Sequence, residues 1–207
     1  MAENTDLWQI ERDLTEQGIG IICGCDEAGA GPLAGPVYAA AVILPPYCQI
    51  EGLNDSKKLT EKKREALYEV ITQKAVCWAV ARMEAAEIDA TDILSARMKA
   101  MQQAMDALTI QPEIALIDGN RDKGRSAAIT TPHKLVVGGD GKSASIAAAS
   151  ILAKVSRDRY MEKMEEAYPG YGFAKHKGYG TKAHYAALEK LGPCPIHRRS
   201  FLKKLYG

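Results

Sequence analysis

The chain contains no apolar stretch that is both long enough and free enough of charge to span a bilayer. It also lacks an excess of charge of either sign, because 27 basic and 26 acidic residues give a net charge of +1, so overall charge does not indicate a nucleic-acid binder. Its five cysteines lack zinc-finger spacing, which favours buried free thiols in a reducing compartment. The polar, acidic first residues are unlike a signal or transit peptide. These absences predict a soluble, cytoplasmic protein without a membrane partner.

The 207 residues contain no repeats, no low-complexity segment and no linker rich in proline, glycine or serine, which predicts a single domain over 1–207. Hydrophobic periodicity predicts helices over 6–16, 60–74 with Thr60 as N-cap, 91–108 with Thr91 as N-cap, and from about Ser143 onward. The helix at 91–108 is predicted to bury a stripe of Ile93, Leu94, Met98, Met101, Met105 and Leu108. The predicted strands span 19–25, 37–44, 76–83, 113–117 and 135–137. This order predicts an α/β fold, in which helices flank a mixed central β-sheet and residues of about 170–207 form a C-terminal helical and loop extension.

Two adjacent carboxylates, Asp26 and Glu27, follow the apolar run of 19–25 and lead directly into a glycine-rich segment. Like charges repel, and a carboxylate that is partly removed from water needs a positive partner. Carboxylate oxygens are hard ligands that suit Mg²⁺ and Mn²⁺. The glycines that follow allow the backbone to come close to whatever the metal contacts. The pair therefore predicts a metal site that faces a ligand.

Two further aspartates, Asp118 and Asp140, each come shortly after a hydrophobic run. Because parallel strands end at one edge of an α/β sheet, Asp118 and Asp26 would be neighbours if their strands pair in parallel. Carboxylates that converge there could hold two Mg²⁺ ions about 4 Å apart, an arrangement that promotes phosphodiester cleavage. An aspartate after a strand is also an ordinary turn former. On local sequence that alternative stays open for Asp118 and is favoured for Asp140.

Several segments resemble one known family in the same order over nearly the whole chain. Residues 24–29 (GCDEAG) and 31–37 (GPLAGPV) are similar to the opening motif of bacterial ribonuclease HII, the type 2 ribonuclease H. The further matching segments are 53–59 (LNDSKKL), 116–120 (LIDGN), 145–155 (SIAAASILAKV), 157–159 (RDR), 171–173 (YGF), 176–181 (HKGYGT) and 197–201 (HRRSF). Each segment alone is a weak signal, whereas their shared order is very specific.

The resemblance implies an RNase H-like fold and an endonuclease that depends on Mg²⁺ or Mn²⁺. Such an enzyme hydrolyses RNA paired with DNA, and it also incises DNA duplexes 5′ of single embedded ribonucleotides, leaving 3′-hydroxyl and 5′-phosphate ends. The resemblance implies that Asp26, Glu27, Asp118 and Asp140 are the catalytic carboxylates and bind two metal ions. It further implies a monomer that needs no organic cofactor.

Substrate contacts can be assigned from the same resemblance. Gly29, Ala30 and Gly31 resemble the backbone segment that senses the ribose 2′-hydroxyl, and Tyr179 resembles the tyrosine that packs on the next deoxyribose. The other expected contacts are Ser56, Lys57, Lys58, His176, Lys177 and Arg198. Plainer interpretations stay open: a solvated helix start for the two lysines of 57–58, a structural role for His176, and a surface cluster for Arg198 with Arg199. The histidines at 176, 184 and 197 are too scattered along the chain to indicate a zinc site.

Two positions depart from the family pattern. Ala30 stands where arginine is usual, and Gly138 stands where lysine is common. The missing guanidinium predicts weaker substrate binding than in a typical member, while the metal site stays intact.

Two other functions compete with a nuclease. A hybrid-binding protein that has lost cleavage is disfavoured, because it would gain nothing from keeping four costly carboxylates. A dinucleotide-binding oxidoreductase would use the glycine turn as a phosphate cradle, but the apolar run at 37–44 follows at once and leaves no room for the required helix. Asp26 and Glu27 would also repel a pyrophosphate.

Overall fold

Five strands form one mixed sheet in the computed structural model, which describes residues 6–54 and 56–206. They are β1 (Ile22–Ala28), β2 (Val37–Ile43), β3 (Cys77–Met83), β4 (Ile114–Asp118) and β5 (His133–Val136), in the spatial order β3-β2-β1-β4-β5. β2 pairs antiparallel with both β1 and β3, whereas β4 pairs parallel with both β1 and β5. Asp55 of the 53–59 segment lies outside the described residues, as do residues 1–5.

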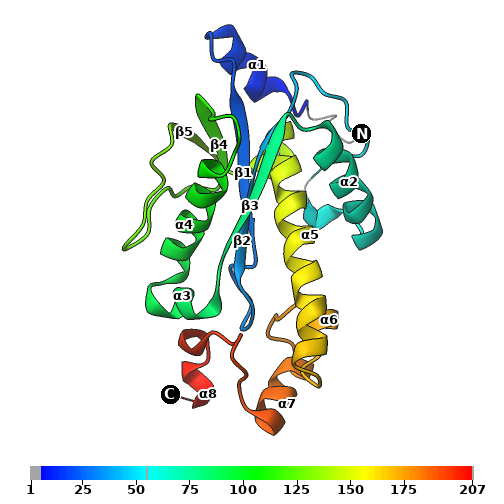
Figure 1. Cartoon of the computed structure of the whole chain (residues 1–207), viewed down its shortest axis with the longest axis vertical. Helices are drawn as coiled ribbons and strands as arrows, with labels where there is room; N and C mark the ends of the chain where they lie inside the picture. The colour runs from blue at the N-terminus through cyan, green and yellow to red at the C-terminus, as the bar shows by residue number, and fades with distance from the viewer. Residues whose placement is uncertain (1–5, 55, 207) are drawn as a thin grey trace.

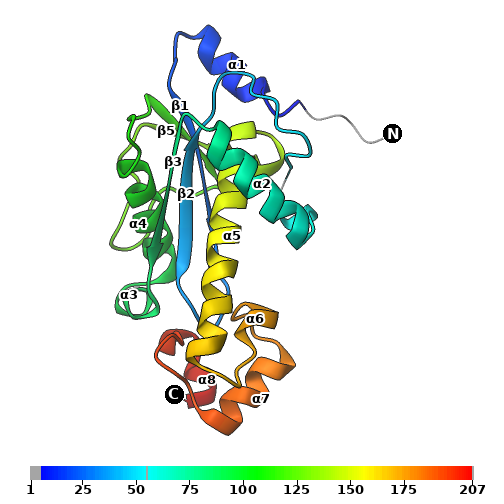
Figure 2. The ribbon, with the colours of Figure 1, turned by 45° about the vertical axis from the view of Figure 1, so that its right-hand side comes forward.

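Helices cover both faces of this sheet (Figures 1 and 2). One face carries α4 (Ile93–Asp106), preceded by α3 (Ala85–Ala90), and the other carries α5 (Ala144–Ala167), against which α2 (Glu61–Lys74) packs. At one end of the molecule lies α1 (Gln9–Glu16), and at the opposite end lie α6 (Phe173–His176), α7 (Lys182–Leu191) and α8 (Lys203–Tyr206). The mixed sheet flanked by helices confirms the predicted fold class. None of the described helices is long and apolar enough to cross a membrane.

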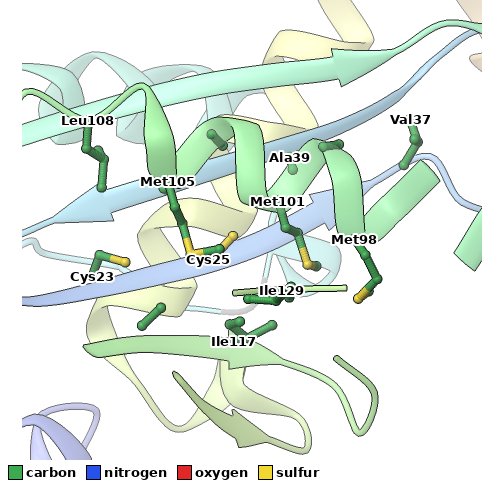
Figure 3. Close-up of a cluster of buried hydrophobic side chains, with 14 of the residues drawn as sticks. Cys23, Cys25, Val37, Ala39, Met98, Met101, Met105, Leu108, Ile117 and Ile129 are labelled. Carbon is green, nitrogen blue, oxygen red and sulfur yellow. The ribbon is translucent and has the colours of Figure 1, made fainter. Parts of the chain in front are cut away.

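The layer between α4 and the sheet is filled by methionines and small side chains (Figure 3). Cys23 and Cys25 of β1 both point into this layer, because alternate residues of a strand share a face. Met98, Met101 and Met105 of α4 meet them and are at most 1% exposed. Burial of such a side chain contributes about 1.5–3 kcal/mol relative to exposure. The predicted stripe of this helix is therefore confirmed at Met98, Met101, Met105 and Leu108, whereas Ile93 and Leu94 are only partly buried. All five cysteines are free thiols, as expected, and all of them are buried except Cys48, which is half-buried.

The first strand differs from its prediction. β1 begins at Ile22 instead of residue 19 and continues to Ala28, because Asp26 and Glu27 pair with Ala40 and Ala39 of β2. The two carboxylates therefore lie within a strand instead of after it. Since successive residues of a strand point to opposite faces, Asp26 and Glu27 face opposite sides of the sheet.

The predicted helix at 91–108 is divided into two. Thr91 ends α3, where its hydroxyl donates to the carbonyl oxygen of Glu87 at 2.9 Å, and it is therefore not available as a cap for the next helix. Asp92 is the N-cap of α4 and accepts a hydrogen bond from the backbone N–H of Ser95 at 2.9 Å. The prediction of Thr91 as N-cap was wrong, because both residue types can cap a helix and α3 had not been foreseen.

The predicted N-cap of α2 and the predicted start of α5 near Ser143 are both confirmed. The Thr60 hydroxyl accepts from the backbone N–H of Lys63 at the start of α2, and the Ser143 hydroxyl accepts from that of Ile146 at the start of α5. Glu11 of α1 adds a second anchor at the start of α5, because its Oε1 accepts from the Ser143 hydroxyl at 2.7 Å. The position of this helix end matters for the site described below.

The contact of α5 with β1 depends on Gly24. A Cβ added at Gly24 would lie 2.0 Å from the carbonyl carbon of Ser145, which is helix backbone and cannot rotate away as a side chain would. We expect Gly24→Ala to lower the free energy of unfolding by about 3 kcal/mol, the upper range for overpacking. Urea denaturation measures this change. Gly20→Ala is the control, because its Cβ would meet only Glu113 Oε2 at an ordinary 3.6 Å. A loss at Gly24 no larger than at Gly20 would contradict the packing.

Candidate active site

Three aspartates from three elements meet on the α5 side of the sheet. Asp26 lies in β1, Asp118 is the last residue of β4, and Asp140 lies in the 3₁₀ turn Gly139–Gly141 that precedes α5. Each offers a carboxylate oxygen, and these three oxygens lie within 4.8 Å of one another. Asp26 and Asp140 are buried. The parallel pairing of β1 with β4 explains why Asp26 and Asp118 are neighbours, as the sequence predicted.

Local hydrogen bonds fix the orientation of these carboxylates. Asp118 Oδ1 accepts from the backbone N–H of Gly139 at 2.6 Å, which ties the end of β4 to the turn that carries Asp140. Asp140 Oδ2 lies 3.2 Å from the ammonium of Lys57. Asp140 therefore belongs to a turn, as its local sequence favours, and also contributes its carboxylate to the cluster. The two interpretations are compatible, because the turn aims the side chain.

The electrostatics of the cluster fit a divalent cation. Burial, followed by the negative charges of Glu27 and Asp118, raises the pKa of Asp26 well above its usual value. The ionised form of such a group is costly unless a positive charge compensates it. Three converging carboxylates are hard oxygen ligands of the kind that Mg²⁺ and Mn²⁺ prefer. The residues therefore fit a divalent metal ion on their donor chemistry.

Glu27 is not a member of this group, since it lies on the opposite face of β1. Its Oε1 is 2.5 Å from Nη2 of Arg97, which α4 supplies. Burial raises the pKa of Glu27, and the charge of Arg97 opposes that rise. Among the described residues, Glu27 Oε2 and Arg97 Nε are buried without a hydrogen-bond partner. An unsatisfied buried polar atom costs about 1–3 kcal/mol, so this carboxylate also has capacity for a further ligand.

Arg97 was missed by the sequence analysis. It lies next to Met98 on a helix whose buried stripe was recognised, and a basic residue beside such a stripe usually faces water. Nothing in the local pattern of 91–108 indicates that this arginine reaches β1. Only the three-dimensional packing of α4 on the sheet reveals the contact.

Two buried arginines hold the glycine loop that follows β1. Arg157 of α5 and Arg198 have no exposed surface, and among the described residues their guanidinium groups donate only to backbone carbonyl oxygens. Arg157 donates to Ala34, Pro36 and Lys177, and Arg198 donates to Gly29, Ala30 and Gly35. Burial, and then the nearby charge of Arg157, lowers the pKa of Arg198 to about 9. Arg198 therefore remains positively charged at neutral pH.

The arginines also determine which way the loop peptides point. The carbonyl oxygens of Gly29 and Ala30 lie 2.6 and 2.8 Å from the Arg198 guanidinium. In a trans peptide the N–H points opposite to the carbonyl, so the N–H groups of Ala30 and Gly31 point away from Arg198. Gly29 has φ +90°, and a Cβ there would lie 1.9 Å from Arg157 Nε, so no side chain fits. The loop is thus held by both arginines, and the N–H groups of Ala30 and Gly31 lie on the side away from Arg198.

Of the other expected substrate residues, some lie where a substrate could reach them. Tyr179 is 44% exposed, and its ring centroid lies 5.8 Å from the Arg157 guanidinium carbon, beside the glycine loop. Lys57 and Lys58 lie in the 3₁₀ turn Ser56–Lys58 and are exposed, while Ser56 itself is buried. The exposure of the two lysines agrees with their alternative interpretation as a solvated helix start, although Lys57 also pairs with Asp140.

The remaining three expected contacts are engaged by other groups of the protein. His176 is buried, with Nε2 2.8 Å from the carbonyl oxygen of Tyr171. The Lys177 ammonium lies 2.5 Å from Glu162. Arg198 is fully buried, so its interpretation as part of a surface cluster was wrong, whereas its neighbour Arg199 is exposed. These three residues therefore stabilise the loops around the site through contacts within the protein.

His176, His184 and His197 form one buried cluster, although they are scattered in the sequence. The rings of His176 and His184 stack at 4.4 Å, and the Nε2 atoms of His184 and His197 are 3.0 Å apart. His197 Nδ1 accepts from the backbone N–H of Cys194, so its Nε2 carries the proton and donates to His184. His184 Nδ1 in turn donates to the carbonyl oxygen of Tyr179. One hydrogen bond therefore joins His184 to His197, and the other ring nitrogens of these two histidines bond to the backbone.

Acid is expected to destabilise this cluster. Burial lowers the pKa of His184 and lowers that of His197 to about 4. An unfolded histidine titrates near pH 6.5, so between about pH 6.5 and 4 the unfolded chain binds more protons than the folded one. The stabilisation is therefore complete above pH 6.5 and is lost as pH falls toward 4. We expect the urea midpoint to fall over this range and to fall less steeply in His197→Gln. If the urea midpoints of the wild type and His197→Gln fall equally steeply with pH, the buried histidines are not the cause of the lost stability.

Comparison with known proteins identifies the family. The family model for ribonuclease HII matches residues 23–204. The ribonuclease HII of Idiomarina loihiensis is 59% identical over 181 residues, covering 87% of this chain and 95% of that protein. The ribonuclease HII of Caldicellulosiruptor bescii is 48% identical over 205 residues, covering 99% of this chain and 98% of that protein. The crystal structure of ribonuclease H2 from Pyrococcus horikoshii OT3 superimposes with a TM-score of 0.71 at 26% identity, covering 87% of this chain and 93% of that chain. The chain belongs to the ribonuclease HII family, metal-dependent endonucleases that hydrolyse RNA in RNA–DNA hybrids.

Proposed function

We propose that this enzyme also incises DNA duplexes on the 5′ side of single embedded ribonucleotides, leaving 3′-hydroxyl and 5′-phosphate ends. One observation carries the proposal: the rigid loop of Gly29, Ala30 and Gly31 directly continues the strand that holds Asp26. A backbone segment that can recognise a hydroxyl group is therefore fixed next to the carboxylate cluster. The 2′-hydroxyl is what distinguishes a ribonucleotide from its DNA neighbours.

We propose that Asp26, Asp118 and Asp140 hold two divalent ions, Mg²⁺ or Mn²⁺. We further propose that Glu27, which pairs with Arg97 on the other face of β1, joins them as a fourth ligand when its side chain turns toward the cluster. Such ions, when bound, supply Lewis acidity that promotes attack of water on phosphorus and stabilises the departing 3′-oxygen. The protein contributes the oxygen ligands and their orientation. The Gly139 N–H holds Asp118, and the start of α5 holds the turn that carries Asp140.

The loop and the C-terminal segment support recognition of the junction. The N–H groups of Ala30 and Gly31 can donate to a hydroxyl or phosphate oxygen, because their carbonyl partners are turned toward Arg198. The exposed ring of Tyr179 offers a surface for the next deoxyribose. The backbone N–H of Leu33 donates to the carbonyl oxygen of Gly178 at 2.9 Å, which ties the Tyr179 loop to the glycine loop. We therefore infer that residues of about 170–207 form a substrate-binding extension.

Positive charge near the site would attract the phosphate backbone. Lys57 and Lys58 are exposed beside the cluster, and we propose that they and Ser56 contact phosphates. Arg157 and Arg198 make their hydrogen bonds to uncharged carbonyl groups, so their charges are not neutralised by a bonded carboxylate. We assign His176, Lys177 and Arg198 to positioning of the two loops.

The experiment that tests recognition uses three labelled DNA duplexes that differ at one sugar. The first carries one ribonucleotide, the second a 2′-O-methyl nucleotide, and the third only deoxynucleotides. We expect one metal-dependent cut, 5′ of the ribonucleotide, in the first duplex alone. Equal cleavage of all three would rule out recognition of the hydroxyl. Cleavage of a long RNA–DNA hybrid without incision of the first duplex would support the proposed metal site and exclude recognition of the junction.

Ala30→Arg is expected to tighten substrate binding by about fivefold, since a guanidinium near phosphates contributes about 1 kcal/mol at a partly exposed site. The backbone contacts of residue 30 do not depend on its side chain, because Arg198 bonds its carbonyl oxygen. Fluorescence anisotropy with the ribonucleotide duplex in Ca²⁺ measures the Kd. Ala30→Met is the control of similar length without charge. If Ala30→Arg and Ala30→Met have equal Kd values for the duplex, a guanidinium at position 30 does not strengthen substrate binding.

We also infer that residues 1–207 act as a single domain and as a monomer. The three aspartates, the glycine loop and the segment that carries Tyr179 all come from one chain, so the site does not require a second copy. Light scattering on the purified protein, with and without duplex, determines the oligomeric state.

A further inference from the structure

We propose that Arg97 holds Glu27 apart from the three aspartates and competes with a divalent cation for its carboxylate. This inference rests on the proposed function, because it assumes that Glu27 becomes a metal ligand. The sequence does not indicate that Arg97 acts on Glu27, since Arg97 lies in a helix on the opposite side of the sheet from Asp140. Arg97 would then be a positioning residue that sets how readily the fourth carboxylate joins the site.

The geometry of the ion pair is the first support. Asp26 and Glu27 are neighbours on β1 and face opposite sides of the sheet, so Glu27 points toward α4. There the Arg97 guanidinium meets it at 2.5 Å, and the two side chains are only 27% and 13% exposed. A pair so far removed from water is weakly screened and therefore holds the carboxylate in place.

The incompleteness of the pair is the second support. An arginine can bind a carboxylate through two parallel hydrogen bonds, which satisfies both oxygens. Here only Glu27 Oε1 is bonded, whereas Glu27 Oε2 and Arg97 Nε are buried without a partner among the described residues. Such a contact leaves one oxygen available for a stronger ligand. A cation bound there would repel the guanidinium, so each weakens the binding of the other.

The test measures Mn²⁺ binding to the full chain by isothermal titration calorimetry without nucleic acid. Glu27→Gln identifies the binding event that depends on Glu27. For that event we expect Arg97→Met to bind Mn²⁺ about tenfold more tightly than the wild type, because a positive charge next to the ligand has been removed. Arg97→Lys keeps the charge and is expected to stay within about twofold of the wild type.

Lys99→Met is the matched control. Lys99 lies on the same helix and loses a charge equally, but its half-exposed ammonium is 3.7 Å from Glu87, and residues two apart on a helix do not share a face. We expect no change in Mn²⁺ affinity for this variant. An Arg97→Met protein with unchanged or weaker Mn²⁺ binding would overturn the proposal and leave Arg97 as a structural link between α4 and β1.

Thermal melting provides a second readout that is independent of catalysis. Without metal, Arg97→Met is expected to melt at a lower temperature than the wild type, because Glu27 is left buried and unpaired. Mn²⁺ should raise its melting temperature by more than that of the wild type. If Arg97→Met does not fold, Arg97→Gln takes its place, because glutamine retains a hydrogen-bond donor without the charge. Its Mn²⁺ affinity and melting temperature then test the proposal in the same way. Absence of duplex cleavage together with these binding results would refute the proposed incision at ribonucleotides, but it would leave standing the role of Glu27 as a metal ligand, on which this inference rests.

Discussion

Asp26→Asn is expected to abolish hydrolysis and, at the same time, to make the metal-free protein more stable. Asp26 is 5% exposed, and the charges of Glu27 and Asp118 add to the cost of its burial. Because its folded pKa lies above the unfolded value of about 3.9, ionisation at neutral pH opposes folding. Asparagine has the same shape without the charge. We therefore expect Asp26→Asn to raise the free energy of unfolding of the metal-free protein at neutral pH.

The stability advantage expected for Asp26→Asn over the wild type depends on pH. Below about pH 4 the aspartate is protonated in both the folded and the unfolded state, so the advantage of Asp26→Asn should vanish there and be largest at neutral pH. Melting in EDTA measures it, with Asp106→Asn as an exposed control that should change little. Activity on a hybrid should fall about 10³-fold or more, because a group that acts as part of a unit cannot be replaced by the others. A variant that is less stable than the wild type in EDTA would contradict this electrostatic description.

Arg157→Met is expected to be the most destabilising substitution considered for the loop. Arg157 is fully buried and donates to three carbonyl oxygens: those of Ala34, Pro36 and Lys177. Methionine fills a similar volume but leaves these acceptors without their donor in the interior. The removal of one partner from a buried polar network typically costs about 3–5 kcal/mol. Urea denaturation of the metal-free protein measures the loss.

Arg159→Met is the matched control for that substitution. Arg159 lies two residues further along α5 and pairs with Glu65 and Glu69 at the surface, where an ion pair contributes about 0–1 kcal/mol. We also expect folded Arg157→Met to bind the ribonucleotide duplex poorly, because the glycine loop loses its support. Losses of equal size at the two positions would show that Arg157 does not hold the loop.

Several elements could be predicted because their patterns are strong. The stripe of Met98, Met101 and Met105 repeats at helical spacing and identified the face that covers Cys23 and Cys25. The neighbourhood of Asp26 and Asp118 followed from strands that end at one edge of a parallel pair. In both cases the signal lies in the spacing of the residues along the chain.

Other features had no local signal, or one that was ambiguous. β1 extends through Asp26 and Glu27 because β2 pairs with them, and two acidic residues in sequence favour the end of a strand. The contact of Arg97 with Glu27 depends on how α4 crosses the sheet. Arg157, by contrast, did carry a signal: it continues the buried positions Ile146, Ser150 and Ala153 at helical spacing. A charge on that face predicts a buried arginine with specific partners.

The most direct test of the account is cleavage of a labelled DNA duplex with one ribonucleotide in Mg²⁺ or Mn²⁺, beside Asp118→Asn. Asp118 is the control position because Gly139 already holds its carboxylate at the cluster, and asparagine can keep that hydrogen bond. We predict a single cut 5′ of the ribonucleotide for the wild type and none for Asp118→Asn, although the variant should still bind the duplex. Binding without cleavage by the wild type, or cleavage that survives in Asp118→Asn, would contradict the assignment of this carboxylate cluster as the catalytic centre.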